Sequence, residues 1–200
     1  MSGGAKSRVA RVCVYCASSR LADPAFAADA RGLGGLLARH GVTIVYGGGG
    51  VGSMGALADG ALAERGTVIG VLPRFMYDLE WGHPRIAELR VVNDLHERKR
   101  LMIEEVDAIV ALPGGTGTFE ELLEAITWKR LGLHAHPIVI VNLRGYYDPL
   151  LAMLDVAVRE KFMDDRHRAM WSVVAGASGV IDAISAAPPW GPGARSFAVP

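Results

Sequence analysis

The sequence predicts an α/β fold: a single-domain, doubly wound, Rossmann-like and mostly parallel sheet with helices on both faces. Short apolar runs rich in β-branched residues recur along the 200 residues, and segments with the apolar period of amphipathic helices lie between them. The strand-like runs are apolar at consecutive positions, so both faces of the sheet need cover. In folds of this plan, ligands bind at the carboxyl ends of the strands.

The elements alternate along the chain. The predicted strands cover residues 9–15, 42–46, 68–72, 89–92, 108–112, 138–141 and 171–174. The predicted helices cover residues 25–40, 52–65, 95–106, 118–131 and 149–162. We expect one nucleotide-binding hydrolase domain over residues 9–187, flanked by flexible tails at 1–8 and 188–200, of which the second is rich in Pro and Gly.

Composition narrows the class of protein. The formal net charge is zero, so no overall field attracts the chain to nucleic acid or to an anionic membrane. No apolar run reaches the ~18 residues of a membrane-spanning helix, and we expect a cytoplasmic protein. Cys13 and Cys16 form a CxxC in the first strand-like stretch, where three-residue spacing turns them to opposite faces. This favours two buried reduced cysteines over a redox or metal site.

A first glycine-rich loop follows the second predicted strand. Gly50, Gly52 and Gly55 match the GxGxxG spacing, and Gly48 and Gly49 precede them, so the backbone can approach a phosphate. A dinucleotide site also needs an acidic residue at the end of the next strand, and this strand ends in Val-Leu-Pro. The loop is therefore either a phosphate contact or a tight turn without a ligand.

A second glycine-rich loop, residues 113–118, lies between a buried strand and a helix. Backbone N–H groups and the helix dipole favour an anion there, most naturally a nucleotide phosphate. Glu120, Glu121 and Glu124 follow. Thr118 and Glu121 have the spacing of a capping box, which is a structural role. Spacing alone favours this structural role, but a carboxylate beside an anion site is also placed to act on a sugar attached to the phosphate.

Two cations fall on an inward helix face. In the predicted helix 95–106, Arg98 and Lys99 lie on or beside the buried stripe that contains Met102. Arg98 could pair with Glu121, fork around a phosphate, or extend along the surface to reach water.

Two segments together carry a family resemblance. Residues 95–99 read Leu-His-Glu-Arg-Lys, and residues 113–121 match the pattern PGGxGTxxE in full. With both motifs the chain resembles the LONELY GUY family of cytokinin-activating phosphoribohydrolases, long labelled lysine decarboxylases. The likeness extends over most of the chain, including 13–19, 45–49 and 145–147.

The resemblance implies hydrolysis of the N-glycosidic bond of N6-modified adenosine 5′-monophosphates to the free base and ribose 5-monophosphate. It makes Arg98 and Glu121 the catalytic pair, and implies a homodimer or larger homo-oligomer with no cofactor. Glu80 is the position where the surrounding sequence matches the family poorly. The residues expected to bind the nucleotide are Ser18, Gly48, Gly49, Glu80, Arg98, Lys99, Gly114, Gly115, Thr116, Gly117, Thr118, Glu120 and Thr127.

The chemistry of these residue types agrees with that reaction. Breaking a ribosyl bond builds positive charge on the sugar, which a carboxylate such as Glu121 can stabilise while it orients water. The departing base gathers negative charge, which Arg98 can offset. We expect no metal site, because His134 and His136 lack further ligands at helical spacing.

The same residues also allow other activities. A broader hydrolase that accepts AMP and a non-catalytic nucleotide-binding protein are the alternatives. Lysine decarboxylation requires a Schiff-base lysine, and the chain offers only Lys6, Lys99, Lys129 and Lys161. Lys6 lies in the expected tail, Lys129 and Lys161 lie at helix ends, and Lys99 belongs to the motif already described.

Overall fold

The computed structural model describes residues 9–79 and 81–198 and has one parallel sheet of seven strands. The strand order is β4-β3-β2-β1-β5-β6-β7, and every neighbouring pair is parallel. This confirms the predicted fold class. The strands are β1 (Arg11–Tyr15), β2 (Thr43–Tyr46), β3 (Val68–Pro73), β4 (Glu88–Val92), β5 (Ala108–Ala111), β6 (Ile138–Val141) and β7 (Trp171–Val174).

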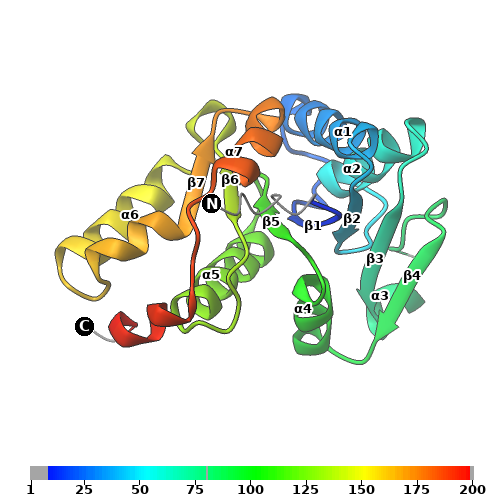
Figure 1. Cartoon of the computed structure of the whole chain (residues 1–200). Coiled ribbons are helices and arrows are strands. Elements are labelled where there is room, and N and C mark those ends of the chain that lie inside the picture. Colours follow the sequence, from blue (N-terminus) through cyan, green and yellow to red (C-terminus); the bar gives the residue numbers. More distant parts are fainter. Residues whose placement is uncertain (1–8, 80, 199–200) are drawn as a thin grey trace, which may run out of the picture.

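Helices cover both faces of this sheet (Figure 1). The α-helices are α1 (Pro24–Arg39), α2 (Gly52–Ala63), α3 (Arg74–Asp78), α4 (Leu95–Ile103), α5 (Thr116–Arg130), α6 (Asp148–Arg159) and α7 (Val180–Ala186). Two core clusters result: α1, α2 and α7 pack on one face, and α4, α5 and α6 pack on the other. The five predicted helices are present, whereas α3 and α7 were not predicted because each is only one or two turns long.

The order of the strands places the ligand crevice. From β1 the chain steps outward through β2, β3 and β4, and then returns to β5 on the other side of β1. At such a switch point the loops that follow the two central strands diverge and leave a crevice at their carboxyl ends. The loops after β1 and β5 therefore border the site.

The cysteines behave as the strand geometry predicts. Cys13 is in the core cluster beneath α4 and α5, and Cys16 is in the cluster beneath α1 and α2. Both thiols are free and buried, and burial raises the pKa of each well above its ordinary value. They are therefore inert core residues on opposite faces.

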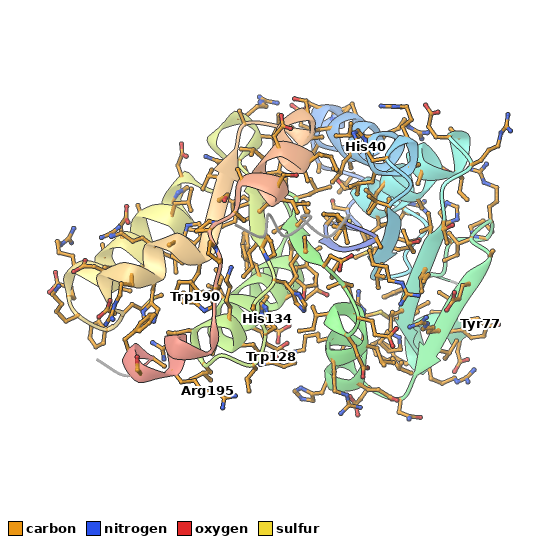
Figure 2. The ribbon with its side chains drawn as sticks, in the orientation of Figure 1. His40, Tyr77, Trp128, His134, Trp190 and Arg195 are labelled. Carbon is orange, nitrogen blue, oxygen red and sulfur yellow. The ribbon has the colours of Figure 1, made fainter. Side chains whose placement is uncertain are left out.

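The C-terminal segment differs from the expected flexible tail. Residues 188–198 include a short 3-10 helix, Pro192–Phe197, and Trp190 lies against α5 (Figure 2). The Trp190 indole Nε1 donates to the Lys129 carbonyl at 3.0 Å, and the Lys129 ammonium lies over the indole ring. The Arg195 guanidinium also donates to the Leu131 and Gly132 carbonyls, both at 3.2 Å, so several contacts attach a Pro- and Gly-rich segment whose composition alone predicts disorder.

Among the described helices, none has the length and apolar character needed to cross a lipid bilayer. Residues 9–79 and 81–198 also hold no group of three His, Cys, Asp or Glu side chains suited to a metal ion. His134 and His136 instead stack on each other, and His134 Nε2 bonds the Ala125 carbonyl at 2.8 Å.

Candidate active site

A cavity of about 1320 Å³ opens at the carboxyl ends of the central strands. Four parts of the chain line it: residues 16–20 after β1, the glycine-rich loop after β2, a segment between β3 and β4, and the start of α5. Arg98 and Glu121 also line it. The cavity therefore occupies the crevice that the strand order creates.

Glu121 lies in this cavity wall rather than in a helix cap. The helix begins at Thr116 with Gly115 as its N-cap, so Thr118 is already inside the helix and the predicted capping box is wrong. The extended backbone of Gly115 starts the helix two residues earlier than the sequence pattern predicted. Glu121 is consequently free of a capping role, and its side chain is only 6% exposed.

Burial changes the acidity of this carboxyl group. It raises the pKa of Glu121 to about 7, while the nearby guanidinium of Arg98 opposes the rise. A carboxyl group with such a pKa can hold or release a proton near neutral pH, as a general acid or base must.

Arg98 is held in place by the ends of two strands. Its Nε donates to the Val71 carbonyl at 3.1 Å, and its Nη2 donates to the Gly47 carbonyl at 3.4 Å. The same Nη2 lies 3.6 Å from Glu121 Oε1. Of the options that the sequence left open for Arg98, the structure shows the pairing with Glu121, and the surface orientation is wrong because the side chain is 9% exposed.

The end of α4 that carries Arg98 is fixed by a cap. The Asp94 carboxylate accepts from the backbone N–H groups of His96 and Glu97, both at 2.8 Å. The cap sets where the helix begins, and hence which residues face the sheet. Arg98, Lys99 and Met102 are buried as a result.

The side chain of Lys99 contacts different residues from those that Arg98 contacts. Its ammonium bonds the carboxylates of Glu120 and, at 3.1 Å, Glu124. Burial lowers the pKa of Lys99, but the two carboxylates outweigh this and raise it. With Thr127, these glutamates occupy one face of α5 at helical spacing.

The predicted nucleotide-binding residues therefore divide into groups. Those that line the cavity are Ser18, Gly49, Arg98, Gly115, Thr116, Gly117 and Thr118. Those that lie outside its lining are Gly48, Lys99, Gly114, Glu120 and Thr127. Glu80 lies outside the described residues.

Two tyrosine side chains form hydrogen bonds with the loop that begins α5. The Tyr146 hydroxyl donates to the Gly114 carbonyl at 2.6 Å, and the Tyr147 hydroxyl donates to the Leu112 carbonyl at 2.7 Å. These bonds use backbone carbonyls and not the first N–H groups of the helix, which have no intrahelical acceptor. Neither tyrosine was predicted from the sequence to have a role, although both belong to a segment that resembles the family.

The segment between β3 and β4 forms one part of the cavity wall, although Glu80 was its only residue predicted from the sequence to bind the nucleotide. Met76, Trp81 and His83, from the segment between β3 and β4, line the cavity together with apolar side chains of Leu72 and Leu89. Tyr77, from the same segment, lies at the β4 side of the molecule (Figure 2). The signal in the sequence was the group of aromatic and aliphatic residues at 75–81, which no predicted core element used.

The chain is similar to known proteins over most of its length. A family model described as "Possible lysine decarboxylase" matches residues 54–184. The Oryza sativa subsp. japonica protein named cytokinin riboside 5′-monophosphate phosphoribohydrolase LOG is 42% identical over 166 residues, which are 83% of this chain and 69% of the relative. The chain belongs to the LONELY GUY family. An Arabidopsis thaliana member with the same enzyme name is 42% identical over 163 residues, which are 82% of this chain and 75% of the relative.

Solved structures extend the fold beyond the LONELY GUY family. The molybdenum cofactor carrier protein of Chlamydomonas reinhardtii has a TM-score of 0.68 at 22% identity, over 89% of this chain and 97% of the carrier. A likeness at this level of identity shows a shared fold only. The residues at the site, and not the fold, have to carry the functional argument.

Proposed function

We propose that this chain is a phosphoribohydrolase that cleaves the N-glycosidic bond of N6-modified adenosine 5′-monophosphates. One observation carries the proposal: a buried carboxylate, Glu121, faces a fixed guanidinium, Arg98, in a cavity that also contains a helix N-terminus. The named activity of the relatives is the same reaction.

The phosphate is proposed to bind at the start of α5. Gly115, Thr116 and Gly117 line the cavity there, and their N–H groups belong to the first turn, which has no intrahelical acceptor. The loop after β2 is a weaker candidate. Its Gly50 N–H already donates to the Trp81 carbonyl, and the Met54 N–H donates to the Ala17 carbonyl.

The sugar then reaches Glu121, which is in the second turn of the same helix. Cleavage at C1′ builds positive charge on the ribose ring, and the ionised carboxylate stabilises it and orients the attacking water. Arg98 keeps Glu121 in position and supplies positive charge as the base leaves. Water adds to C1′ as the bond from C1′ to the base nitrogen breaks. The proton of this water passes to the Glu121 carboxylate and then to the departing base, so the products are the free base and ribose 5-monophosphate and Glu121 is ionised again.

The base is proposed to lie toward the segment between β3 and β4. Met54, Leu72, Met76, Trp81 and Leu89 give that end of the cavity an apolar wall. An apolar wall favours a hydrocarbon substituent on N6 over the bare amino group of AMP. AMP as an equal substrate is therefore the second candidate, and a non-catalytic nucleotide binder is the third.

We further propose a cytoplasmic homodimer or larger homo-oligomer. Lys99, Glu120 and Thr127 lie outside the cavity, yet the family resemblance assigns them to nucleotide binding. The large side chains of Leu95 of α4, Leu123 of α5 and Leu131, the C-cap of α5, are exposed at 45%, 38% and 38%. Static light scattering on the purified protein tests the assembly.

The decisive experiment offers the protein isopentenyladenosine 5′-monophosphate, AMP, isopentenyladenosine and lysine in parallel. We expect free isopentenyladenine from the first, at least tenfold less base from AMP, and no cadaverine from lysine. Glu121→Gln should reduce base release about 10²- to 10⁴-fold, the usual contribution of a general acid or base. Chromatography of the products measures all four.

The matched control is Glu104→Gln, which neutralises an exposed carboxylate at the end of α4. It should release base at the wild-type rate. Base release by Glu121→Gln at that same rate would contradict the proposed mechanism. Equal rates on AMP and on the isopentenyl nucleotide would favour the second candidate.

A further inference from the structure

One polar cluster next to the cavity has no role in the proposed mechanism. His83 lines the cavity, yet its side chain is only 4% exposed. Its Nδ1 accepts from the Arg85 backbone N–H at 3.2 Å, so the ring proton is on Nε2. Nε2 then donates to Asp59 Oδ1 at 3.3 Å.

Asp59 connects this histidine to two helices. The residue belongs to α2, and its Oδ2 accepts from the Arg31 guanidinium of α1 at 3.2 Å. The Arg85 guanidinium also bonds its Oδ1. Burial works against ionisation of Asp59, but the hydrogen bond from His83 and the charge of Arg85 outweigh it and lower its pKa. The carboxylate is therefore a charged anchor on a rigid helix.

The segment that His83 belongs to has few other attachments. We call residues 76–79 and 81–84 the wall segment. In the described residues from 74 to 84, His83 is the one buried side chain, while Tyr77, Leu79 and Trp81 are about half exposed. A segment that buries so little apolar surface depends on its polar contacts for a fixed position.

Backbone bonds transmit the position of His83 to the cavity. The His83 N–H donates to the Gly48 carbonyl at 2.9 Å, and the Gly50 N–H donates to the Trp81 carbonyl at 3.1 Å. Gly49 and Gly82 form an antiparallel bridge between these two bonds. The backbone of residues 81–83 is thereby hydrogen-bonded to the loop after β2, and this holds Trp81 in the cavity wall.

We infer that His83, anchored by Asp59, is a positioning residue that holds the base-binding end of the cavity in place. This inference rests on the proposed function, because it takes the base to lie against the wall segment. In the proposed function the phosphate and the scissile bond lie at α5, whereas the hydrogen bonds of His83 and Asp59 connect them to α1, Arg85 and Gly48. Loss of the anchor should therefore weaken binding of the base and leave the chemical step unchanged.

The test compares Asp59→Ala and His83→Ala with wild type. We expect the KM for isopentenyladenosine 5′-monophosphate to rise roughly tenfold, which is the loss expected for one hydrogen bond to a charged group. The value of kcat should stay within about twofold. The inhibition constant of ribose 5-phosphate, which lacks the base, should also stay within about twofold. His83→Gln, which can still donate toward Asp59, should recover most of the lost affinity.

Two control variants separate this role from general stability. Glu64→Ala removes the Arg39–Glu64 ion pair, which also joins α1 to α2 and has a 2.7 Å contact, but does not touch the wall segment. Arg31→Ala removes the contact of Asp59 with α1 and leaves His83 in place. Both should keep the wild-type KM.

The outcomes are distinct. An equal rise in the inhibition constant of ribose 5-phosphate, a fall in kcat at constant KM, or a matching change in Glu64→Ala would each overturn the inference. If wild type releases no base from any nucleotide, the proposed function fails. The inference is then decided by calorimetry, which measures the affinities of wild type, His83→Gln and His83→Ala for AMP and for ribose 5-phosphate. If all three proteins bind AMP with equal affinity, the inference is refuted.

Discussion

The two glycine-rich loops have similar sequences but different uses of glycine. Each follows a buried strand and opens a helix, one after β2 and the other after β5. In the first loop, a methyl group added at the glycines meets other atoms of the protein. In the second loop, a methyl group added at Gly115 or Gly117 meets nothing within 4 Å.

The first loop needs glycine for packing. A Cβ at Gly47 would lie 2.0 Å from Arg98 Nη2, so this glycine makes room for the guanidinium. Gly52 has φ +60, and a Cβ there would lie 2.5 Å from the Ser19 carbonyl oxygen. The number of glycines in this loop is thus explained without a bound phosphate.

The second loop keeps open space beside its backbone. Gly114 alone is packed, since a Cβ there would lie 2.1 Å from Thr118 Oγ1. Gly115 and Gly117 are exposed to the cavity at the positive end of the α5 dipole. A glycine whose added Cβ would meet no protein atom is a candidate for close approach by a ligand. The number of glycines in a loop therefore does not show which of two such loops binds a phosphate.

Among the glycine substitutions, the largest effect is expected for Gly47→Ala. The added methyl group would displace the Arg98 guanidinium from Glu121, while backbone strain is not involved because the φ of Gly47 is not positive. Loss of one fixed electrostatic partner costs about 10²- to 10³-fold in rate. We expect kcat/KM for the isopentenyl nucleotide to fall about a hundredfold in a protein that still folds.

Gly32→Ala is the matched control for that variant. It adds the same methyl group in the interior of α1, where nothing lies within 4 Å, and alanine favours a helix. It should keep full activity and unfold at the same or a higher temperature. Full activity in Gly47→Ala would mean that Arg98 does not need its observed position.

The next largest effects are expected for one substitution in each loop, Gly115→Ala in the second and Gly52→Ala in the first. Gly115→Ala should leave the thermal midpoint unchanged and weaken binding of ribose 5-phosphate roughly tenfold, because the methyl group occupies the approach of the phosphate. Gly52→Ala should lower the thermal midpoint and leave the affinity for ribose 5-phosphate unchanged. Its positive φ and the contact with Ser19 should destabilise the fold by about 1–3 kcal/mol. Unfolding curves and calorimetry measure the two quantities.

If Gly115→Ala binds ribose 5-phosphate as tightly as wild type, the phosphate does not lie at this loop. If Gly52→Ala is the variant that loses phosphate affinity at unchanged stability, the two loops have exchanged roles. Either result would reverse the comparison.

Much of the fold was predictable because its signals are local. All seven strands are apolar runs within one or two residues of their predicted bounds. The start of α5 was misplaced because a glycine N-cap has no side chain to mark it, whereas Thr118 and Glu121 imitate a capping box. The cap of α4, in contrast, has a side chain that marks it, because the Asp94 carboxylate accepts from two backbone N–H groups.

The candidate site was predictable only in part. The two motifs identified Arg98 and Glu121, which the structure brings within 3.6 Å. The wall segment has no periodicity, and its anchor joins His83 to Asp59 across 24 positions of sequence. No local pattern encodes such a contact, because it depends on how α2 packs against the segment after β3.

The smallest effect is expected for a change of pH from 7 to 8, and it acts through Glu121 of α5, the helix that the second loop begins. With a pKa of about 7, Glu121 is about half ionised at pH 7 and nearly fully ionised at pH 8. The ionised form is the active one, so kcat/KM should rise with pH, tenfold per unit well below pH 7 and only about twofold from pH 7 to pH 8.

The same shift has an opposite consequence for stability. Because the folded state holds this proton more tightly than the unfolded state, the contribution of Glu121 to stability is present below its ordinary pKa of 4.5 and is lost as pH rises through about 7. Denaturant midpoints of wild type should therefore fall relative to Glu121→Gln between pH 5 and pH 8. Parallel midpoints over that range would show that Glu121 titrates as an ordinary carboxyl group, and the rise in kcat/KM would then belong to another residue.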